Sequence, residues 1–103
     1  MKIIASVDNP SPYHAAARND LTGINDFRIK MCIERHADDF SARHHELGHI
    51  LYYQAYSHLP DIFQSGANDG FHEAVGDLLT LSITPDYLQK IGMVTDDEAT
   101  QAN

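Results

Sequence analysis

The chain has 103 residues, 43% of them hydrophobic, and a formal net charge of −8, a composition that suits the core of one domain or of part of one. The acidic balance, with no cluster of Lys and Arg, argues against nucleic acid or an anionic membrane surface as a partner. The apolar run in residues 1–7 is too short for a signal peptide, and no stretch of the sequence is long enough to span a membrane.

The first third of the chain predicts extended structure. Residues 1–12 hold a short apolar run that ends at two prolines, which predicts a strand or an entry segment. Residues 13–35 predict a β-hairpin, because residues 27–33 alternate apolar with mainly polar side chains and small residues precede them across a loop. This hairpin is either an ordinary piece of the core or an edge to which an extended peptide adds as another strand.

The helix predicted over residues 38–58 carries an H-E-x-x-H motif. Residues four apart lie on one face of a helix, so His45 and His49 can direct ring nitrogens at one ion. Glu46 then lies beside the metal, where its carboxylate can take a proton from a zinc-bound water. The alternative is a pair of hydrogen-bonded core histidines. Apolar residues on nearly every side predict a buried helix; they are Leu47, Ile50, Leu51, Tyr52, Tyr53, Ala55 and Tyr56.

A second, amphipathic helix is predicted over residues 69–83, with an apolar stripe formed by Phe71, Ala74, Val75, Leu78 and Leu79. A catalytic zinc has three protein ligands and an open position, so a third ligand is required, and Glu73 is the best candidate. Asp77, one turn further along, suits a carboxylate that accepts the free N–H of a zinc-bound histidine. Gly76 beside it would let another helix approach closely. The alternative is a solvated acidic face.

Capping residues are available for each helix. The candidates are Asp38, Asp39 or Ser41 for the first helix, Asn68 or Asp69 for the second, and Thr84 with Pro85 for a short third helix that ends at Gly92. Residues 93–103 are acidic and polar with nothing to bury, so we expect a frayed tail there.

Three blocks of this sequence, in this order, resemble the zinc-site region of the angiotensin-converting enzyme family. They are N-D-F-R-I-K at residues 25–30, H-H-E-L-G-H-I at 44–50 and G-A-N-D-G-F-H-E-A-V-G-D at 66–77. The resemblance covers roughly residues 13 to 95. It implies a mainly α fold in which the zinc-motif helix packs against a second, ligand-bearing helix beside a short N-terminal β-hairpin. It also implies that residues 1–103 are a fragment of a larger metallopeptidase domain.

The resemblance implies a role for five of the residues above. His45, His49 and Glu73 would be the ligands of one zinc ion per site. Glu46 would be the general base that later returns the proton to the leaving amine. Asp77 matches an aspartate that hydrogen-bonds to a zinc-bound histidine.

The match in the hairpin implies contacts with substrate and also contains a departure from the family. His14 matches a histidine that touches the substrate, and Ala15 and Ala17 match backbone positions that pair with it, which favours the strand-addition interpretation. The family has a cysteine bridged to the one matched by Cys32, but here that position is Tyr13. The implied disulfide is therefore absent.

The activity that the resemblance implies is that of a hydrolase, a carboxypeptidase-type metalloprotease that releases C-terminal dipeptides from oligopeptides. The partner is an oligopeptide with a free C-terminus. The family's residues that stabilise the oxyanion, hold the substrate carboxylate and bind chloride have no counterpart here, so the activity of the isolated chain stays open. The family is typically extracellular, either secreted or membrane-anchored. The alternatives are a zinc-binding but inactive fragment that binds a peptide or partner, and a helical interaction domain without metal, which the intact ligands disfavour.

Overall fold

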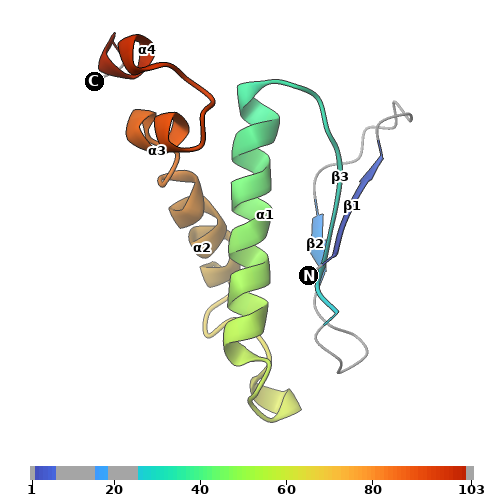
Figure 1. Ribbon diagram of the computed structural model, residues 1–103. Coiled ribbons are helices and arrows are strands. Elements are labelled where there is room, and N and C mark those ends of the chain that lie inside the picture. The colour runs from blue at the N-terminus through green and yellow to red at the C-terminus, as the bar shows by residue number, and fades with distance from the viewer. Residues whose placement is uncertain (1, 7–15, 19–25, 102–103) are drawn as a thin grey trace.

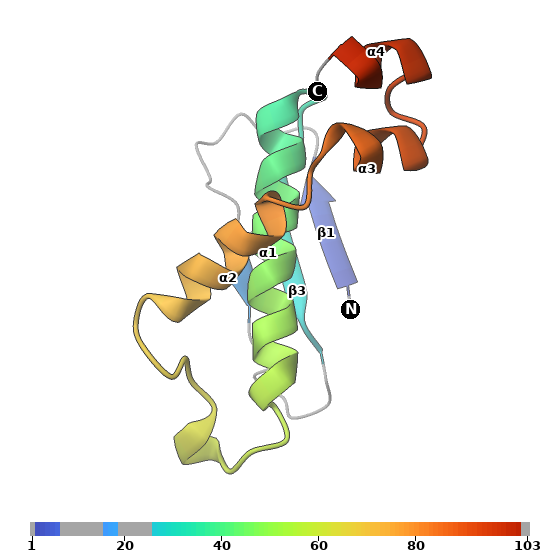
Figure 2. The same cartoon turned by 90° about the vertical axis from the view of Figure 1, so that its left-hand side faces the viewer.

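The computed structural model describes residues 2–6, 16–18 and 26–101. The elements in chain order are β1 (Lys2–Ser6), β2 (Ala16–Arg18), β3 (Arg28–Cys32), α1 (Ala37–Tyr56), the 3-10 helix η1 (Asp61–Phe63), α2 (Phe71–Thr80), α3 (Pro85–Lys90) and α4 (Asp96–Gln101). The long helix α1 lies between the strands on one side and the other helices on the other (Figure 1). After a quarter turn, α2 is seen to cross α1 (Figure 2). The predicted fold class, mainly α with a motif helix packed on a second helix, is confirmed.

The strands form a three-stranded sheet in the order β1-β3-β2. β2 pairs antiparallel with β3, with Ala17 opposite Ile29, which is the pairing expected for the hairpin. β1 pairs parallel with the other edge of β3, with Ile4 opposite Lys30. Among the described residues, no strand pairs with the outer edge of β2.

The core lies between β3 and α1. Phe27, Ile29 and Met31 alternate along the chain and are buried, as the period of two predicts, and they pack with Ile50 of α1. Burying a large apolar side chain contributes roughly 1.5–3 kcal/mol, so this cluster is what holds the sheet on the helix. The partly buried residues packed against it are Ala17, Ile33, Ala42, Leu47 and Tyr53.

The start of α1 differs from the prediction. The N-cap is His36, whose Nδ1 accepts a hydrogen bond from the backbone N–H of Asp39 at 3.4 Å. The predicted caps Asp38, Asp39 and Ser41 are wrong, because all three lie inside the helix. Two of them still place negative charge in the first turn, where the helix dipole favours it.

The N-cap predicted for α2 is wrong, and the N-cap predicted for α3 is confirmed. Neither Asn68 nor Asp69 caps α2, whose N-cap is Gly70 without a side-chain hydrogen bond. Asn68 instead closes the preceding turn, because its Oδ1 accepts from the N–H of Gly70 at 3.0 Å. Thr84 does cap α3, and its hydroxyl accepts from the N–H of Tyr87 at 3.2 Å.

The C-terminal segment, expected to be frayed, forms α4 instead. Thr95 and Glu98 make a capping box in which Oε2 of Glu98 accepts from the N–H and the hydroxyl of Thr95, both at 2.8 Å. The N–H of Glu98 donates to the Thr95 hydroxyl at 3.4 Å. Local capping therefore organises a segment that has little to bury.

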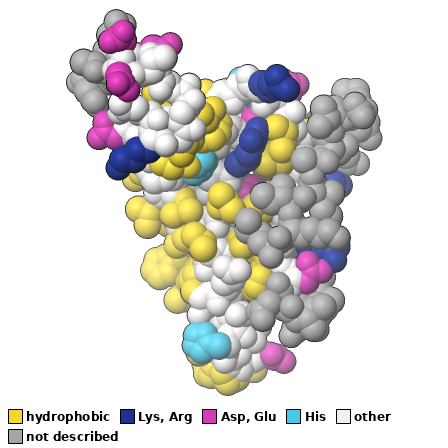
Figure 3. Space-filling view, in the orientation of Figure 1, with side chains coloured by type: hydrophobic (Ala, Val, Ile, Leu, Met, Phe, Trp, Pro, Cys, Tyr) yellow, Lys and Arg dark blue, Asp and Glu magenta, His cyan; other side chains and the backbone are white. Residues whose placement is uncertain are grey.

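Apolar surface remains open on the helices. The apolar residues on nearly every side of α1 predicted a buried helix, and the burial is partial: Ile50 and Tyr56 are buried, whereas Leu51 is 51% exposed and Ala55 is also exposed. On α2 and just after it, Phe71, Leu78 and Leu81 are exposed, and Figure 3 shows apolar side chains gathered over α2. Within the described residues, no helix has both the length and the apolarity needed to cross a membrane.

Candidate metal centre

Two glycines let α1 and α2 approach closely enough for their side chains to meet. A Cβ atom built on Gly48 of α1 would lie 2.6 Å from the Cα of Gly76 in α2 and 2.7 Å from the carbonyl oxygen of Val75. Any larger residue at Gly48 would push the helices apart. This backbone contact brings the motif face of α1 against the middle of α2, as the glycine in the predicted acidic stripe indicated.

Three metal-ligating side chains converge beside this crossing. His45 Nε2 lies 3.2 Å from one carboxylate oxygen of Glu73, and His49 Nε2 lies 3.5 Å from the other. One ligand atom from each residue lies within 4.8 Å of the other two. Ligands about 2.1 Å from a tetrahedral zinc ion are separated by roughly 3.4 Å, so two imidazoles and one carboxylate at these distances fit a zinc ion.

The outward side of this group is open to solvent. The Glu73 side chain is 71% exposed, whereas those of His45 and His49 are 20% and 11% exposed. The two histidines are therefore held on the inner side of the group, and the carboxylate of Glu73 faces solvent.

Asp77 holds the ring of His45. Its Oδ1 lies 3.0 Å from His45 Nδ1, one turn along α2 from Glu73. With Nδ1–H donated to this carboxylate, the lone pair of His45 Nε2 faces the candidate metal position. The pair proposed from sequence spacing is thus in contact.

His49 is held differently, by a second histidine. Its Nδ1 lies 3.4 Å from Nδ1 of His72, whose Nε2 lies 2.8 Å from the hydroxyl of Tyr56. Burial lowers the pKa of His49, and the Glu73 carboxylate opposes that shift. Burial also raises the pKa of Tyr56 to about 12, so the hydroxyl keeps its proton. Sequence reasoning missed His72 and Tyr56, although the motif block places His72 next to Glu73.

Glu46 follows His45 on α1 and is turned toward the sheet, where it contacts Ala17. It is 6% exposed, and burial raises the pKa of its carboxyl, while the charge of His45 and the backbone N–H of Ala17 lower it. In the part of the chain that the structure describes, its Oε2 is buried without a hydrogen-bond partner. A buried carboxylate with one unused oxygen is a strong proton acceptor.

The contact with Ala17 places Glu46 at an edge of the sheet. An N–H that donates to Glu46 is not donated to β3, so it points from the outer edge of β2. A peptide added at that edge would lie beside Glu46. His14 and Ala15, the other predicted contacts with substrate, lie outside the described residues.

His44, the first histidine of the motif block, is not part of the metal group. Its Nδ1 lies 2.9 Å from the carbonyl oxygen of Phe40, and its Nε2 lies 3.0 Å from the hydroxyl of Tyr87 in α3. The Nδ1 contact lies within α1, and the Nε2 contact fastens α3 to α1.

Comparisons with known proteins match this chain to one family. A family model described as angiotensin-converting enzyme matches residues 11–103. A protein named angiotensin-converting enzyme from Haematobia irritans exigua is 47% identical over 91 residues, which cover 84% of this chain and 15% of that protein. Proteins of the same name from Bos taurus and Sus scrofa are 46% and 45% identical over 86 residues, covering 82% of this chain and 6% of each relative. The chain thus spans a small part of the length of these relatives.

Proposed function

Because the chain belongs to the angiotensin-converting enzyme family, a family of metallopeptidases, we propose that it is the metal-site region of a zinc peptidyl-dipeptidase. The reaction is the release of dipeptides from the free C-terminus of oligopeptides. The observation that carries the proposal is the convergence of His45, His49 and Glu73 on one position, with Glu46 on the same helix turn. Secretion or membrane anchoring, as in the family at large, is part of this proposal.

The proposed metal ligands are Nε2 of His45, Nε2 of His49 and the carboxylate of Glu73. Zinc bound there supplies a Lewis acid that polarises the scissile carbonyl and lowers the pKa of water toward neutrality. Asp77 orients His45 by accepting its Nδ1–H. These residues come from two helices whose crossing is fixed by glycine, which supports a site assembled within this chain.

Glu46 is the proposed general base. Its burial and its raised pKa suit a carboxylate that takes a proton from water and returns it to the leaving amine. The outer edge of β2 is the proposed support for the substrate backbone, with Ala17 there and with His14 and Ala15 in the preceding segment. An edge of β2 that pairs with no other described strand, next to the base, supports this arrangement.

A second candidate function is zinc binding without catalysis, with the chain serving to bind a peptide or partner. It is favoured by the exposed Glu73 and by the small share of the relatives' length that the chain spans. The groups that stabilise an oxyanion, hold the substrate's carboxylate and bind chloride are proposed to lie outside this chain. Catalysis normally requires such groups.

The test begins with zinc content and then measures cleavage. The purified chain and His45→Ala are dialysed, and zinc per chain is measured; about one zinc in the first and none in the second supports the site. Release of a dipeptide from a blocked tripeptide is then followed with and without a chelator. Cleavage lost with chelator supports the enzyme, whereas bound zinc without cleavage favours the second candidate. In a complete domain, Glu46→Ala should abolish turnover and keep zinc; substantial remaining cleavage would contradict its assignment as base.

A further inference from the structure

We propose that His72 is a positioning residue that holds His49 with Nε2 directed at the metal position. This inference rests on the proposed zinc site, because it concerns how one of its ligands is oriented. Within the described residues, the contact that His49 Nδ1 makes is with Nδ1 of His72, at 3.4 Å. His72 thus contacts Nδ1 of His49 as Asp77 contacts Nδ1 of His45, but the contacting group is an imidazole and not a carboxylate.

The proton positions along this chain of contacts are selected by metal binding at His49 Nε2, because the Tyr56 hydroxyl at the other end can donate or accept. A histidine that offers Nε2 to a metal carries its proton on Nδ1. The acceptor for that proton must be the lone pair on His72 Nδ1, so the proton of His72 is on Nε2. It is donated to the hydroxyl oxygen of Tyr56, which lies 2.8 Å away. In this arrangement His49 has a free Nε2. In the reversed one, Tyr56 donates to His72, His72 donates to His49 Nδ1, and the His49 proton is on Nε2.

Packing holds the His72 ring in the place this role requires. Three tyrosines of α1 surround it, with ring centroids 4.6 Å away for Tyr52, 4.6 Å for Tyr53 and 5.8 Å for Tyr56. The loop before α2 closes another side, because a Cβ at Gly66 would lie 3.3 Å from Cδ2 of His72. The ring has little freedom to turn away from His49.

The contact between His49 and His72 is more buried than the contact between His45 and Asp77, so its loss should cost more. The Asp77 side chain is 76% exposed, so water can replace its carboxylate beside His45. Tyr56 is 6% exposed and His49 is 9% exposed, so water has poor access to the His72 side. A buried N–H without an acceptor costs about 1–3 kcal/mol. Removal of His72 should therefore disturb His49 more than packing loss alone would.

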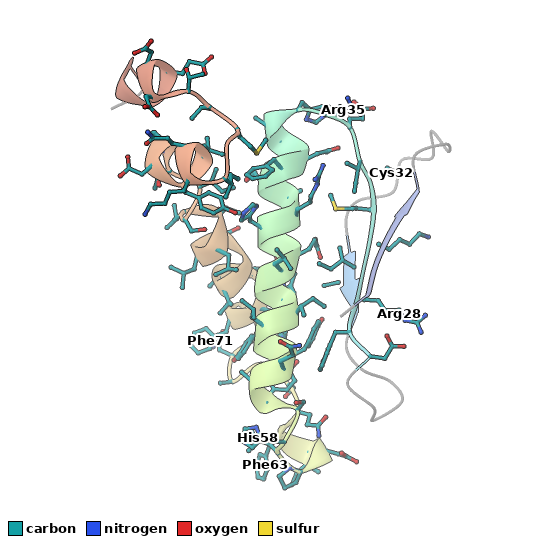
Figure 4. All side chains as sticks on the ribbon, in the orientation of Figure 1. Arg28, Cys32, Arg35, His58, Phe63 and Phe71 are labelled. Atoms are coloured by element: carbon teal, nitrogen blue, oxygen red, sulfur yellow. The ribbon has the colours of Figure 1, made fainter. Side chains whose placement is uncertain are left out.

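The first test is zinc affinity of the 103-residue chain, measured by competition with a chelating dye. His72→Phe keeps a flat ring but removes the acceptor, and we expect zinc binding to weaken about 10- to 100-fold. His72→Asn places an amide oxygen near the position of Nδ1 and should recover most of that loss. Equal affinity in His72→Phe and the original chain would overturn the proposal, and so would equal losses in the Phe and Asn variants. His58→Phe, at an exposed histidine beyond the end of α1 (Figure 4), controls for loss of a histidine.

The second test needs no metal, so it separates failure of this inference from failure of the proposed zinc site. Glu73→Ala removes the carboxylate beside His49 Nε2, and the side chain that it truncates is 71% exposed. In that variant, nitrogen NMR of the histidine rings should find one proton in the contact between Nδ1 of His49 and Nδ1 of His72, on either ring. Adding His72→Phe should change the nitrogen shift of His49 Nδ1, because its partner is removed. Two Nδ1 atoms without a proton, or no change of that shift in the double variant, would overturn the assignment of His72, even if the original chain binds zinc. If the chain binds no zinc but that proton is found, the proposed function fails and the positioning role stands.

Discussion

The ring of His45 lies where a side chain at Gly76 would have to go. A Cβ atom built on Gly76 would be 2.6 Å from Cε1 and 2.8 Å from Nε2 of His45. Since Nε2 is the proposed ligand atom, the absence of a side chain at Gly76 leaves room for the metal site itself.

Gly76→Ala should therefore act on metal binding more than on folding. The new methyl group meets the end of a side chain that can swing aside, so α1 and α2 can keep their positions. We expect zinc affinity to fall at least about 10-fold, the loss typical when a ligand is misoriented, with helix content by circular dichroism unchanged. Zinc binding equal to that of the original chain would show that the His45 ring is not held where the structure puts it.

Gly48→Ala should act on folding instead. Its methyl group meets backbone, namely the Cα of Gly76 at 2.6 Å and the carbonyl of Val75 at 2.7 Å, and backbone cannot swing aside. We expect the helices to separate at a cost of about 1–3 kcal/mol in the free energy of unfolding, measured by urea denaturation. Gly70→Ala is the matched control, because its nearest neighbour would be a side-chain oxygen at 3.6 Å. Similar losses in both variants would contradict the close crossing.

Regular patterns in the sequence predicted the parts of the fold that depend on them. The alternation of Phe27, Ile29 and Met31 predicted the buried face of β3, and the spacing of His45 and His49 predicted a shared face of α1. These follow from the period of a strand or a helix, which is local. The glycine beside the acidic stripe correctly indicated a close helix contact.

Features that depend on contacts between distant residues could not be predicted in this way. His72 meets His49 and Tyr56 because of the angle at which α2 crosses α1, which no local period specifies. The choice of His36 as cap could not be predicted from capping preference, because Asp and Ser are the stronger N-cap residues in general. The exposure of Leu51 depends on what else packs on α1, and the described part of this chain leaves it open.

Glu46→Gln should stabilise the metal-free chain at neutral pH. Burial raises the pKa of Glu46 in the folded state, so between the ordinary glutamate pKa and the raised one the folded chain binds more protons than the unfolded chain. Stability then falls as the pH rises through that window. The glutamine variant lacks this loss, so its advantage in urea denaturation should grow from acid to neutral pH.

The control for this change is Glu34→Gln, which removes the same charge from an exposed position. That variant should show no comparable advantage that grows with pH. A Glu46→Gln chain that is no more stable than the original at neutral pH would mean that the buried carboxylate costs nothing. The expected gain in stability would accompany loss of the proposed base, as is common where function requires a destabilising residue.

Zinc should raise the midpoint of thermal unfolding. A ligand that binds only the folded chain adds about 2.7 kcal/mol at a free concentration 100 times its dissociation constant. The shift should disappear in His45→Ala, and it should need more zinc in Asp77→Ala, since Asp77 contacts His45 at 3.0 Å. A zinc-induced shift of equal size in all three chains would place the ion elsewhere.

Tyr87→Phe should loosen α3 without disturbing the metal site. The hydroxyl of Tyr87 lies 3.0 Å from Nε2 of His44, whose other nitrogen lies 2.9 Å from the carbonyl of Phe40. Losing such a hydrogen bond costs about 0.5–1.5 kcal/mol, and here the loss falls on the attachment of α3 to α1. Hydrogen exchange should accelerate in residues 85–90 while zinc affinity stays within twofold. A double-mutant cycle with His44→Ala isolates the pair, and a marked loss of zinc in Tyr87→Phe would mean that His44 is coupled to the metal group after all.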